Sequence, residues 1–555
     1  MPGSRKSIAG GGRRVKVAPV ETYDYIVVGA GSAGCVVAER LSADGRHRVL
    51  VLEAGGPDDS FWIKTPIGYG RTFADPRVNW RYDAEASAGL GDRRMYWPRG
   101  RVVGGSGSIN ALVYCRGMPA DFEDWRRLGN VGWGWDDVRP IFELNERRVA
   151  PTGRARDGGP VDVKDVNPFL HPLRRHWFAA AAELGFPVSD DFNGEQPEGV
   201  GCYQITVRDG RRWSAADAFL RPALQRPNLR LIERAWVSRI RFDGRTASGV
   251  EFWVNGERRR ATAAREVILC GGAVNSPQLL QLSGIGPGAL LQSLDIPVIL
   301  DNPAIGDHLQ DHLAVSYSFV ATEPTLNDEL RPFLGKIRNG LNYLLFKRGL
   351  LALSVNQFGG FLRANPAADR PDVQLYFNPI TYGAGDATRK RIDVDPFPGF
   401  ILCFQPTRPT SRGRIIVTRP DFRAPPSIQP NYLSTAKDEQ DVVYGGLLLQ
   451  RIARTQAMRG LIRNPLPPAL DTLDEAGLLA DFRARAATVY HPVSTCRMGP
   501  RMDGSVVDPA LRVYGVDRLR VIDASVFPTV TSANTNAPTL MVARKVADLI
   551  ASGRG

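Results

Sequence analysis

The sequence predicts an α/β fold, α+β overall, in which a Rossmann-like dinucleotide-binding domain is interrupted by a second unit of antiparallel strands. Two observations predict the first domain: a strand, glycine turn and helix at 23–41, and a second apolar strand at 48–55 that contains an acid. The third is a set of alternating segments at 372–377, 399–406 and 413–419, typical of antiparallel strands with one solvated face. With 555 residues, 43% of them apolar, two or more domains are expected.

The glycine turn at 23–41 has the spacing of a dinucleotide-binding fingerprint. Gly29 permits the tight turn, Gly31 lets the backbone approach a pyrophosphate, and Gly34 lets the helix pack on the strand. The pyrophosphate would lie at the helix N-terminus, where free N–H groups favour anions. Glu53, at the end of the second strand, stands where a ribose hydroxyl would be bound. Strand, glycines, helix and acid together predict a bound dinucleotide.

Charge and cysteine content exclude several other classes. The formal charge of +13 comes mainly from Arg, which is scattered along the chain beside Asp and Glu, so we expect no nucleic-acid partner. The six cysteines are far apart and form no CxxC pair, which predicts reduced thiols and a cytoplasmic location. No run of about 18 apolar residues is present, so no integral membrane segment is expected.

Two segments bear on targeting and membranes. Residues 1–21 are predicted to be a disordered basic tail, because no apolar segment follows the charges as a secretory or twin-arginine signal requires. The segment 342–353, NYLLFKRGLLAL, is predicted to be a helix and loop packed on the domain. The alternative, an amphipathic helix on a membrane surface, leaves peripheral membrane association open.

Further glycine-dense turns indicate a large, extended and buried cofactor. Such turns occur at 99–110 and 266–286, and a strand ending in Asp523 with a polar loop occupies 519–530. Over residues 22–552 the chain resembles the glucose–methanol–choline (GMC) oxidoreductases. The resemblance rests on GRVVGGSGSINALVY (100–114), GAVNSPQLLQLSGIG (272–286), YHPVSTCRMG (490–499) and NTNAPTLM (534–541).

This resemblance implies FAD as hydride acceptor and an alcohol as hydride donor. It also implies an FAD-binding domain made of 22–160, 199–318 and 488–555, the last part carrying the catalytic residues. The intervening pieces, 161–198 and 319–487, would form a substrate domain built on an antiparallel sheet flanked by helices, which covers the flavin.

Oxidising an alcohol requires a base for the hydroxyl proton as well as a hydride acceptor. His491, in the block that resembles the family's catalytic histidine segment, is the predicted base. By resemblance Asn536 occupies the second position and would donate a hydrogen bond to the substrate oxygen. Asn534, two residues earlier, is expected to be a structural partner.

The remaining FAD contacts are implied by motif positions. Ile109 stands where members with covalent FAD have a histidine, so a non-covalent FAD is expected. The expected cofactor-binding residues are Gly29, Gly31, Ser32, Gly34, Glu53, Arg101, Val103, Asn110, Val113, Val237, Asp523, Ala524, Pro538 and Thr539, with Asn536 also beside the flavin.

The segment GDHLQDHL places His308 and His312 four residues apart, but no third ligand is evident, so a structural role is favoured and no metal is expected. Tyr376, Phe377 and Tyr490 are the expected substrate-pocket residues. Because Tyr376 lies where choline-oxidising relatives place a histidine, a neutral aliphatic or aromatic primary alcohol is favoured over choline.

Three alternatives stay open at this point. Choline dehydrogenation is the first, and a flavin-dependent lyase or photodecarboxylase of the same fold is the second. The third concerns the electron acceptor, which is either O₂ or a quinone-type compound.

Overall fold

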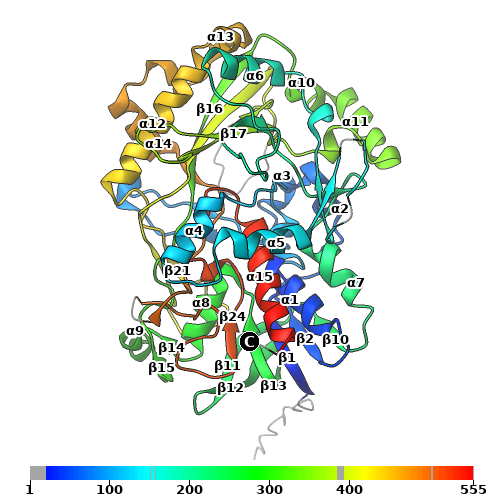
Figure 1. The fold of residues 1–555 in the computed structure, drawn as a ribbon, viewed down its shortest axis with the longest axis vertical. Helices are drawn as coiled ribbons and strands as arrows, with labels where there is room; N and C mark the ends of the chain where they lie inside the picture. The colour runs from blue at the N-terminus through cyan, green and yellow to red at the C-terminus, as the bar shows by residue number, and fades with distance from the viewer. Residues whose placement is uncertain (1–20, 151, 157, 384–392, 502–503, 554–555) are drawn as a thin grey trace, which may run out of the picture.

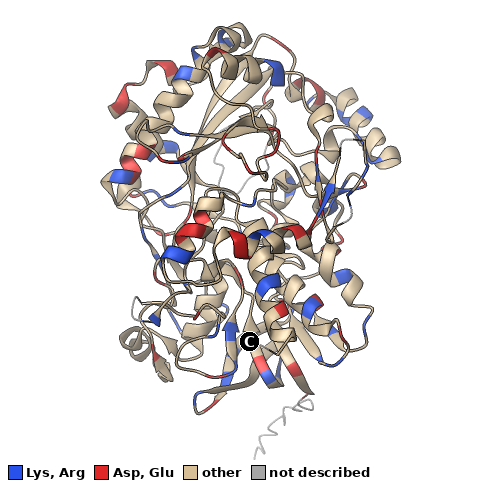
Figure 2. Ribbon diagram, in the orientation of Figure 1, with Lys and Arg blue, Asp and Glu red and all other residues tan. Residues whose placement is uncertain are grey.

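In the computed structural model the chain folds into two joined halves, each organised around one large sheet (Figure 1). The structure describes residues 21–150, 152–156, 158–383, 393–501 and 504–553. The predicted basic tail therefore lies outside the described residues, except for Glu21 at its end. Lys and Arg are interspersed with Asp and Glu over both halves (Figure 2).

The lower half in Figure 1 is built on a mixed sheet with the strand order β10-β2-β1-β13-β12-β11. Its parallel centre consists of β10 (Leu229–Ile232), β2 (Val49–Leu52), β1 (Glu21–Val28) and the C-terminal part of β13 (Glu257–Leu269), against which β24 (Leu519–Val521) also pairs. All four residues of β2 are buried, as expected for a parallel strand with both faces covered. Antiparallel β12 (Thr246–Val254) and β11 (Trp236–Asp243) extend the sheet.

Helices drawn from both ends of the sequence cover this sheet. The helix α1 (Ser32–Ser42) directly follows the glycine turn, and it packs against α15 (Asn536–Ala551) from the C-terminal end of the chain (Figure 1). An ion pair from Arg40 to Asp548 adds to this contact. The helix α8 (Gly272–Leu282) follows β13 in the same way as α1 follows β1. The two strand–turn–helix units therefore place two helix N-termini at one edge of the sheet.

The upper half is built on an antiparallel sheet with the order β22-β16-β19-β18-β17-β7. Its central strands are β16 (Leu313–Ala321), β19 (Gly399–Pro406), β18 (Val373–Asn378) and β17 (Phe358–Leu362), flanked by β22 (Ile462–Pro465) and β7 (Gly199–Cys202), and β23 (Ala487–Thr488) also pairs with β16. The helix α12 (Ala436–Ala453) packs on β19, and α14 (Glu475–Arg485) packs on α12 and β16. The antiparallel sheet flanked by helices is thus confirmed.

Three details differ from the sequence predictions. The strands at 372–377 and 399–406 have no solvated face: β18 is buried throughout, because helices cover one side of the sheet and the other side faces the cavity described below. The segment at 413–419 forms a short strand, β20 (Arg414–Ile416), that pairs with β21 (Ser427–Gln429) outside the main sheet. In the upper sheet β7 pairs with β17 and β16 pairs with β19, although the predicted boundaries place 199–318, which contains β7 and most of β16, in the lower domain.

None of the helices in the described part of the chain is long and apolar enough to cross a membrane. All six cysteines are unpaired. The chain passes between the two halves repeatedly (Figure 1). Residues from distant parts of the sequence therefore meet where the halves join.

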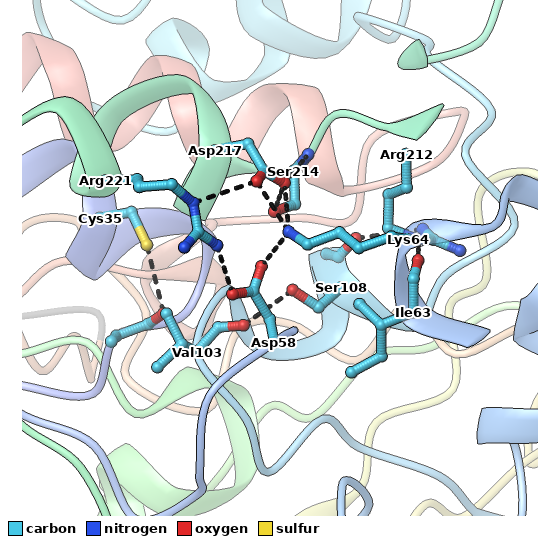
Figure 3. Close-up of polar contacts among 12 residues, drawn as sticks. Cys35, Asp58, Ile63, Lys64, Val103, Ser108, Arg212, Ser214, Asp217 and Arg221 are labelled. Atoms are coloured by element: carbon cyan, nitrogen blue, oxygen red, sulfur yellow. Dashed lines mark hydrogen bonds and ion pairs between the residues drawn. The ribbon is translucent and has the colours of Figure 1, made fainter. Parts of the chain in front are cut away.

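A buried ion cluster fastens the loop after β2 to the lower half (Figure 3). Lys64 lies between two carboxylates, with Nζ 2.6 Å from Oδ2 of Asp58 and 2.7 Å from Oδ1 of Asp217. The guanidinium of Arg221 contacts the same two carboxylates, at 2.6 Å from Asp58 and 3.4 Å from Asp217. Two positive and two negative charges therefore balance, with both carboxylates and Lys64 largely buried and the side chain of Arg221 54% exposed. The cluster connects 58–64 to the π-helical turn at Ala216–Leu220.

Replacing Lys64 by Met is expected to lower the free energy of unfolding by about 3 kcal/mol, because it leaves buried carboxylate charge that Arg221 alone cannot balance. Urea denaturation followed by tryptophan fluorescence measures the effect. The control is Arg77→Met, which removes the partner of Asp75 at a position where the arginine side chain is 81% exposed. That exposed pair is screened by solvent and is expected to contribute much less, so equal effects of the two substitutions would contradict the assigned role of the cluster.

Candidate active site

A cavity of about 1660 Å³ runs from the glycine turn of the lower half to the face of the upper sheet. One end is lined by Gly29, Gly31 and Glu53, and the other by Tyr376 and His491. Pockets for drug-sized ligands usually measure about 300–1,000 Å³, so this volume accommodates a dinucleotide together with a small second molecule.

Glycine is required at each of the three fingerprint positions for a different structural reason. Gly29 has a φ of +103°, and a Cβ there would lie 2.5 Å from the carbonyl oxygen of Cys270. A Cβ on Gly34 would lie 1.9 Å from the carbonyl oxygen of Gly29, so this residue permits the contact of α1 with β1. A Cβ on Gly31 would meet no protein atom nearer than 3.9 Å and would instead fill the cavity. This empty cradle at a helix N-terminus fits a pyrophosphate.

Glu53 closes the same end of the cavity. Its carboxylate accepts hydrogen bonds from the backbone N–H groups of Ala30, at 2.8 Å, and Gly55, at 2.7 Å. Burial raises the pKa of Glu53 to about 7, while these two N–H groups act in the opposite direction. The carboxylate is thus held at the end of β2 by the turn it faces, in the position where the sequence predicts a ribose contact.

Asp523 links the C-terminal strand to the second glycine turn. Its carboxylate accepts hydrogen bonds from the N–H of Gly272, at 2.8 Å, and from the hydroxyl of Ser276, at 2.6 Å. The N–H of Ser525 donates to the other carboxylate oxygen. Burial raises the pKa of Asp523, and these donors oppose that effect. The carboxylate therefore holds β24 and the N-terminus of α8 together at the edge of the cavity.

Most residues predicted from the sequence line the cavity, and five do not. The side chain of Phe377 points away from the cavity into the core, where its ring lies 5.6 Å from that of Trp177. Gly34 packs behind the turn. The guanidinium of Arg101 lies over the ring of Trp80 and donates a hydrogen bond to the carbonyl of Pro76. The predicted residues on the cavity wall are Gly29, Gly31, Ser32, Glu53, Asn110, Val113, Val237, Tyr376, Tyr490, His491, Asp523, Ala524, Asn536 and Thr539, and those off it are Gly34, Arg101, Val103, Phe377 and Pro538.

His491 is the terminal member of a buried chain of hydrogen bonds. Nε2 of His312 lies 2.8 Å from the carbonyl oxygen of Thr407, which can only accept, so Nε2 carries the proton of this imidazole. Nδ1 of His312 is then an acceptor, and Nδ1 of His491, 3.0 Å away, donates to it. These partners assign the proton of neutral His491 to Nδ1 and leave the lone pair on Nε2.

Both imidazoles are held in the neutral form. Burial lowers the pKa of His312 to about 4. Burial also lowers the pKa of His491 well below the ordinary value, and the neighbouring His312 and the positive charge of Arg99 lower it further. His491 therefore keeps an unprotonated Nε2 at neutral pH, which is the state that a general base requires.

Asn534, and not Asn536, lies beside His491. Nδ2 of Asn534 lies 3.1 Å from Nε2 of His491, on the cavity side of the imidazole. The side chain of Asn536 turns to the lower half, where its Oδ1 accepts a 2.7 Å hydrogen bond from the hydroxyl of Ser32 at the start of α1. Residue 534 precedes α15 and residue 536 is its first residue, so the onset of the helix sends the two amides in different directions.

Two charged residues fix the loop that carries His491. Asp311 accepts a 2.7 Å hydrogen bond from the backbone N–H of His491 and further bonds from the hydroxyls of Tyr432 and Thr488. Burial raises the pKa of Asp311 to about 6. Arg99 donates from Nη1 to the carbonyl of Tyr490 and from Nη2 to the hydroxyl of Ser106, at 2.8 Å each. The glycine turn at 99–110 and the loop that carries His491 are therefore held together.

Sequence reasoning missed His312 and Arg99. It assigned His312 a structural role and did not single out Arg99. The segment 307–312 is not helical, and His308 lies on the surface side of it while His312 is completely buried. The scarcity of histidine was the available signal, since two of only six histidines meet here. Within the described ranges no cluster of three or more His, Cys, Asp or Glu has the arrangement of a metal site.

The wall of the cavity around His491 is aromatic and apolar. Tyr376, Tyr382 and Tyr490 line it together with Ile401 and Cys403. Among the described lining residues, the carboxylates are Glu53 and Asp523 at the glycine-rich end, and the exposed Asp393. The arrangement thus pairs a neutral base and an amide donor in a pocket of low polarity, beside a cradle for a dinucleotide.

Known proteins resemble the chain over nearly its whole length. It is 41% identical to the mitochondrial choline dehydrogenase of Homo sapiens over 96% of this chain and 90% of the relative. It is 39% identical to the alcohol dehydrogenase [acceptor] of Pseudomonas putida over 95% of each protein. Among solved structures, the pyridoxine 4-oxidase from "Mesorbium loti" is 30% identical, with a TM-score of 0.84 over 94% of this chain and 98% of that one.

The family models agree with this similarity. Residues 23–314 match the N-terminal model of the GMC oxidoreductases, and residues 409–543 match the C-terminal model. Together these ranges cover more than half of the chain and include the glycine turns, His491 and Asn534. The chain belongs to the GMC oxidoreductases, and it is an FAD flavoprotein that acts on CH–OH groups of its donors.

Proposed function

We propose that the protein oxidises a primary alcohol to the aldehyde, with His491 as the base. The observation that carries the proposal is the hydrogen-bond chain from Thr407 through His312, which leaves Nε2 of His491 unprotonated and facing the cavity. FAD, when bound, supplies the acceptor for the hydride that leaves the alcohol carbon. The protein itself must then remove the hydroxyl proton and hold the oxygen.

Asn534 is the proposed partner of the substrate oxygen, in place of Asn536. Its Nδ2 lies 3.1 Å from Nε2 of His491, so an alcohol oxygen within hydrogen-bond reach of both would replace this direct contact, donate its proton to Nε2 and accept from the amide. The amide has no basic lone pair at neutral pH, so His491 alone accepts the proton. As negative charge develops on the oxygen, the amide hydrogen bond strengthens and stabilises it.

The donor is proposed to be a neutral aliphatic or aromatic alcohol. The described wall beside His491 is aromatic and carries no buried carboxylate that would balance a cationic substrate. Choline is the second candidate, favoured by the 41% identity to a choline dehydrogenase and by tyrosine rings, which are able to bind a quaternary ammonium. A quinone-type compound or O₂ is the proposed electron acceptor.

FAD is proposed to bind without a covalent link. Residue Ile109, on the cavity wall, offers only carbon atoms for such a bond. The cradle at Gly31 would hold the pyrophosphate, Glu53 the ribose, and Asn536 and Thr539 the end of the cofactor near α15. The proposed contacts therefore come from three strand–turn–helix regions that meet at one sheet edge.

The test is anaerobic absorbance near 450 nm of the purified holoenzyme, mixed in the dark with a panel that includes benzyl alcohol, a linear primary alcohol and choline. Bleaching by a neutral alcohol is expected, and bleaching by choline alone would select the second candidate. The variant Asn534→Leu is expected to slow bleaching by roughly 10²–10³-fold with FAD still bound. If no alcohol bleaches the flavin in the dark, the lyase and photodecarboxylase alternatives replace the proposal.

Asn536→Ala is the matched variant for this experiment. It removes the hydrogen bond to Ser32 at the cofactor end and leaves the contact of Asn534 with His491 in place. We expect weaker FAD retention after gel filtration, with near-normal bleaching of the enzyme that keeps its FAD. The reverse pattern, slow bleaching in this variant and normal bleaching in Asn534→Leu, would restore the assignment of the second catalytic position to Asn536.

His312 is proposed to be a positioning residue that sets the tautomer of His491. His312→Leu removes the acceptor for Nδ1 of His491, and a loss of roughly 10²–10⁴-fold in kcat is expected, as for other substitutions that disturb a catalytic histidine's tautomer. His312→Asn returns an acceptor oxygen near the same place and is expected to recover much of the loss. The pH profile of kcat/KM distinguishes a positioning role of His312 from a structural one. A merely structural effect would lower activity without changing the limb of the profile that reports on His491.

Gly31→Ala tests the proposed cofactor cradle. The new methyl group meets no protein atom within 3.9 Å, so the apoprotein is expected to fold and melt normally. It would occupy the space of the pyrophosphate, and FAD affinity is expected to fall by roughly tenfold or more, measured by fluorescence titration of the apoprotein. In contrast, Gly34→Ala is expected to prevent folding, since its Cβ would lie 1.9 Å from a backbone oxygen. Unchanged FAD affinity in Gly31→Ala would contradict the placement.

A further inference from the structure

The helix α11 (Phe333–Phe346) turns its apolar face to solvent. Its residues facing the protein include Asn339 and Tyr343, which are buried. Large apolar side chains at spacings of three and four residues form a stripe on the opposite side. The members of this outer stripe, with their exposed fractions, are Phe333 (75%), Leu334 (77%), Ile337 (41%), Leu341 (53%), Leu344 (55%) and Leu345 (69%).

This pattern is the reverse of a surface helix in a soluble protein, whose apolar stripe faces the core. The exposed stripe is continuous and not a set of isolated side chains, so it indicates a surface that binds a partner. The helix lies at the outer edge of the upper half, next to α2 (Phe61–Lys64) (Figure 1). Phe61 and Trp62, 46% and 39% exposed, extend the apolar surface. The ring centroids of Phe61 and Tyr343 are 6.2 Å apart.

The charges on α11 itself have one sign. Residues 331–348 contain five basic and no acidic residues, and Lys336 and Arg338 lie on opposite flanks of the stripe. Glu329, just before the helix, pairs with Arg338 at 2.8 Å, which leaves a positive excess. Figure 2 shows blue segments, which mark Lys and Arg, along the helix labelled α11 in Figure 1. Leu, Phe and Trp beside Lys and Arg are the composition of helices that lie in a membrane interface.

The same helix forms part of the wall of the active-site cavity. Lys336, Asn339, Gly340 and Leu344 line it, as do Phe61 and Trp62 on the neighbouring helix. Leu344 therefore belongs both to the outer stripe and to the cavity wall, and the two surfaces adjoin at this edge of the molecule. A binding partner that covers the outer stripe would therefore also lie against this part of the cavity wall.

We propose that α11, with Phe61 and Trp62, docks the protein on a membrane surface that carries anionic lipids. The apolar stripe enters the headgroup region, and the flanking Lys and Arg bind the anionic headgroups. A second copy of the chain fits less well, because a symmetric dimer would bring the same basic residues of both copies together. Docking presents the cavity wall to the bilayer, from which an apolar alcohol or quinone would enter.

The experiment is flotation of the holoenzyme with vesicles of equal parts phosphatidylcholine and phosphatidylglycerol, and with vesicles of phosphatidylcholine alone. Binding to the anionic vesicles is expected, with much weaker binding to the neutral ones. The variant Phe333→Ser/Leu334→Ser/Leu345→Ser is expected to lower binding by roughly tenfold or more. These side chains are at least 69% exposed, so the melting temperature and the activity on a water-soluble alcohol are expected to stay unchanged.

The matched control is Val131→Ser/Leu144→Ser, which removes apolar side chains that are 81% and 51% exposed elsewhere on the surface. This control is expected to bind vesicles like the unsubstituted protein. Equal vesicle binding by the α11 variant and the control would overturn the proposal. So would a vesicle-free dimer in analytical ultracentrifugation that the α11 variant converts to monomers, since the stripe would then be an interface between copies. The outcome does not depend on the identity of the alcohol.

Discussion

The active site depends on a short chain of hydrogen bonds that crosses the junction of the two halves. Thr407 follows β19, His312 precedes β16 and His491 follows β23, so the upper sheet supplies all three positions. The partner amide of Asn534 comes from the segment before α15, a helix of the lower half. Neither half alone contains the base together with its partner. The base therefore faces the cofactor cradle only when the two sheets are correctly joined.

The sequence predicted the parts of the site that obey local rules. The glycine turn, Glu53 and Asp523 follow from strand, turn and helix patterns that depend on neighbouring residues, and the structure places all of them on the cavity or behind its turn. The family resemblance added His491. The prediction of Phe377 beside Tyr376 was wrong, because adjacent residues of β18 point to opposite faces of the sheet.

The remaining differences arise from tertiary contacts that no local pattern contains. Asn534 and Asn536 are the same residue type two positions apart, and only the onset of α15 and the position of Ser32 decide which amide reaches His491. The role of His312 depends on Thr407, 95 positions away in the sequence, whose carbonyl fixes the proton of the imidazole. The segment 342–353 was predicted to be a helix and loop packed on the domain, but its first residues end α11, whose apolar face points outward. Periodicity shows that an apolar stripe exists and not which way it faces.

The charges beside His491 explain how a buried histidine can accept a proton at all. Burial, His312 and Arg99 lower its pKa, which keeps it neutral before reaction but destabilises the cation formed when it takes the hydroxyl proton. Asp311, whose pKa is raised by burial to about 6, accepts a hydrogen bond from the backbone N–H of His491, and its ionised form favours the imidazolium. The hydroxyls of Tyr432 and Thr488 stabilise that ionised carboxylate. The ionised carboxylate of Asp311 thus stands beside the loop that carries the base, where its negative charge opposes the positive charge of Arg99.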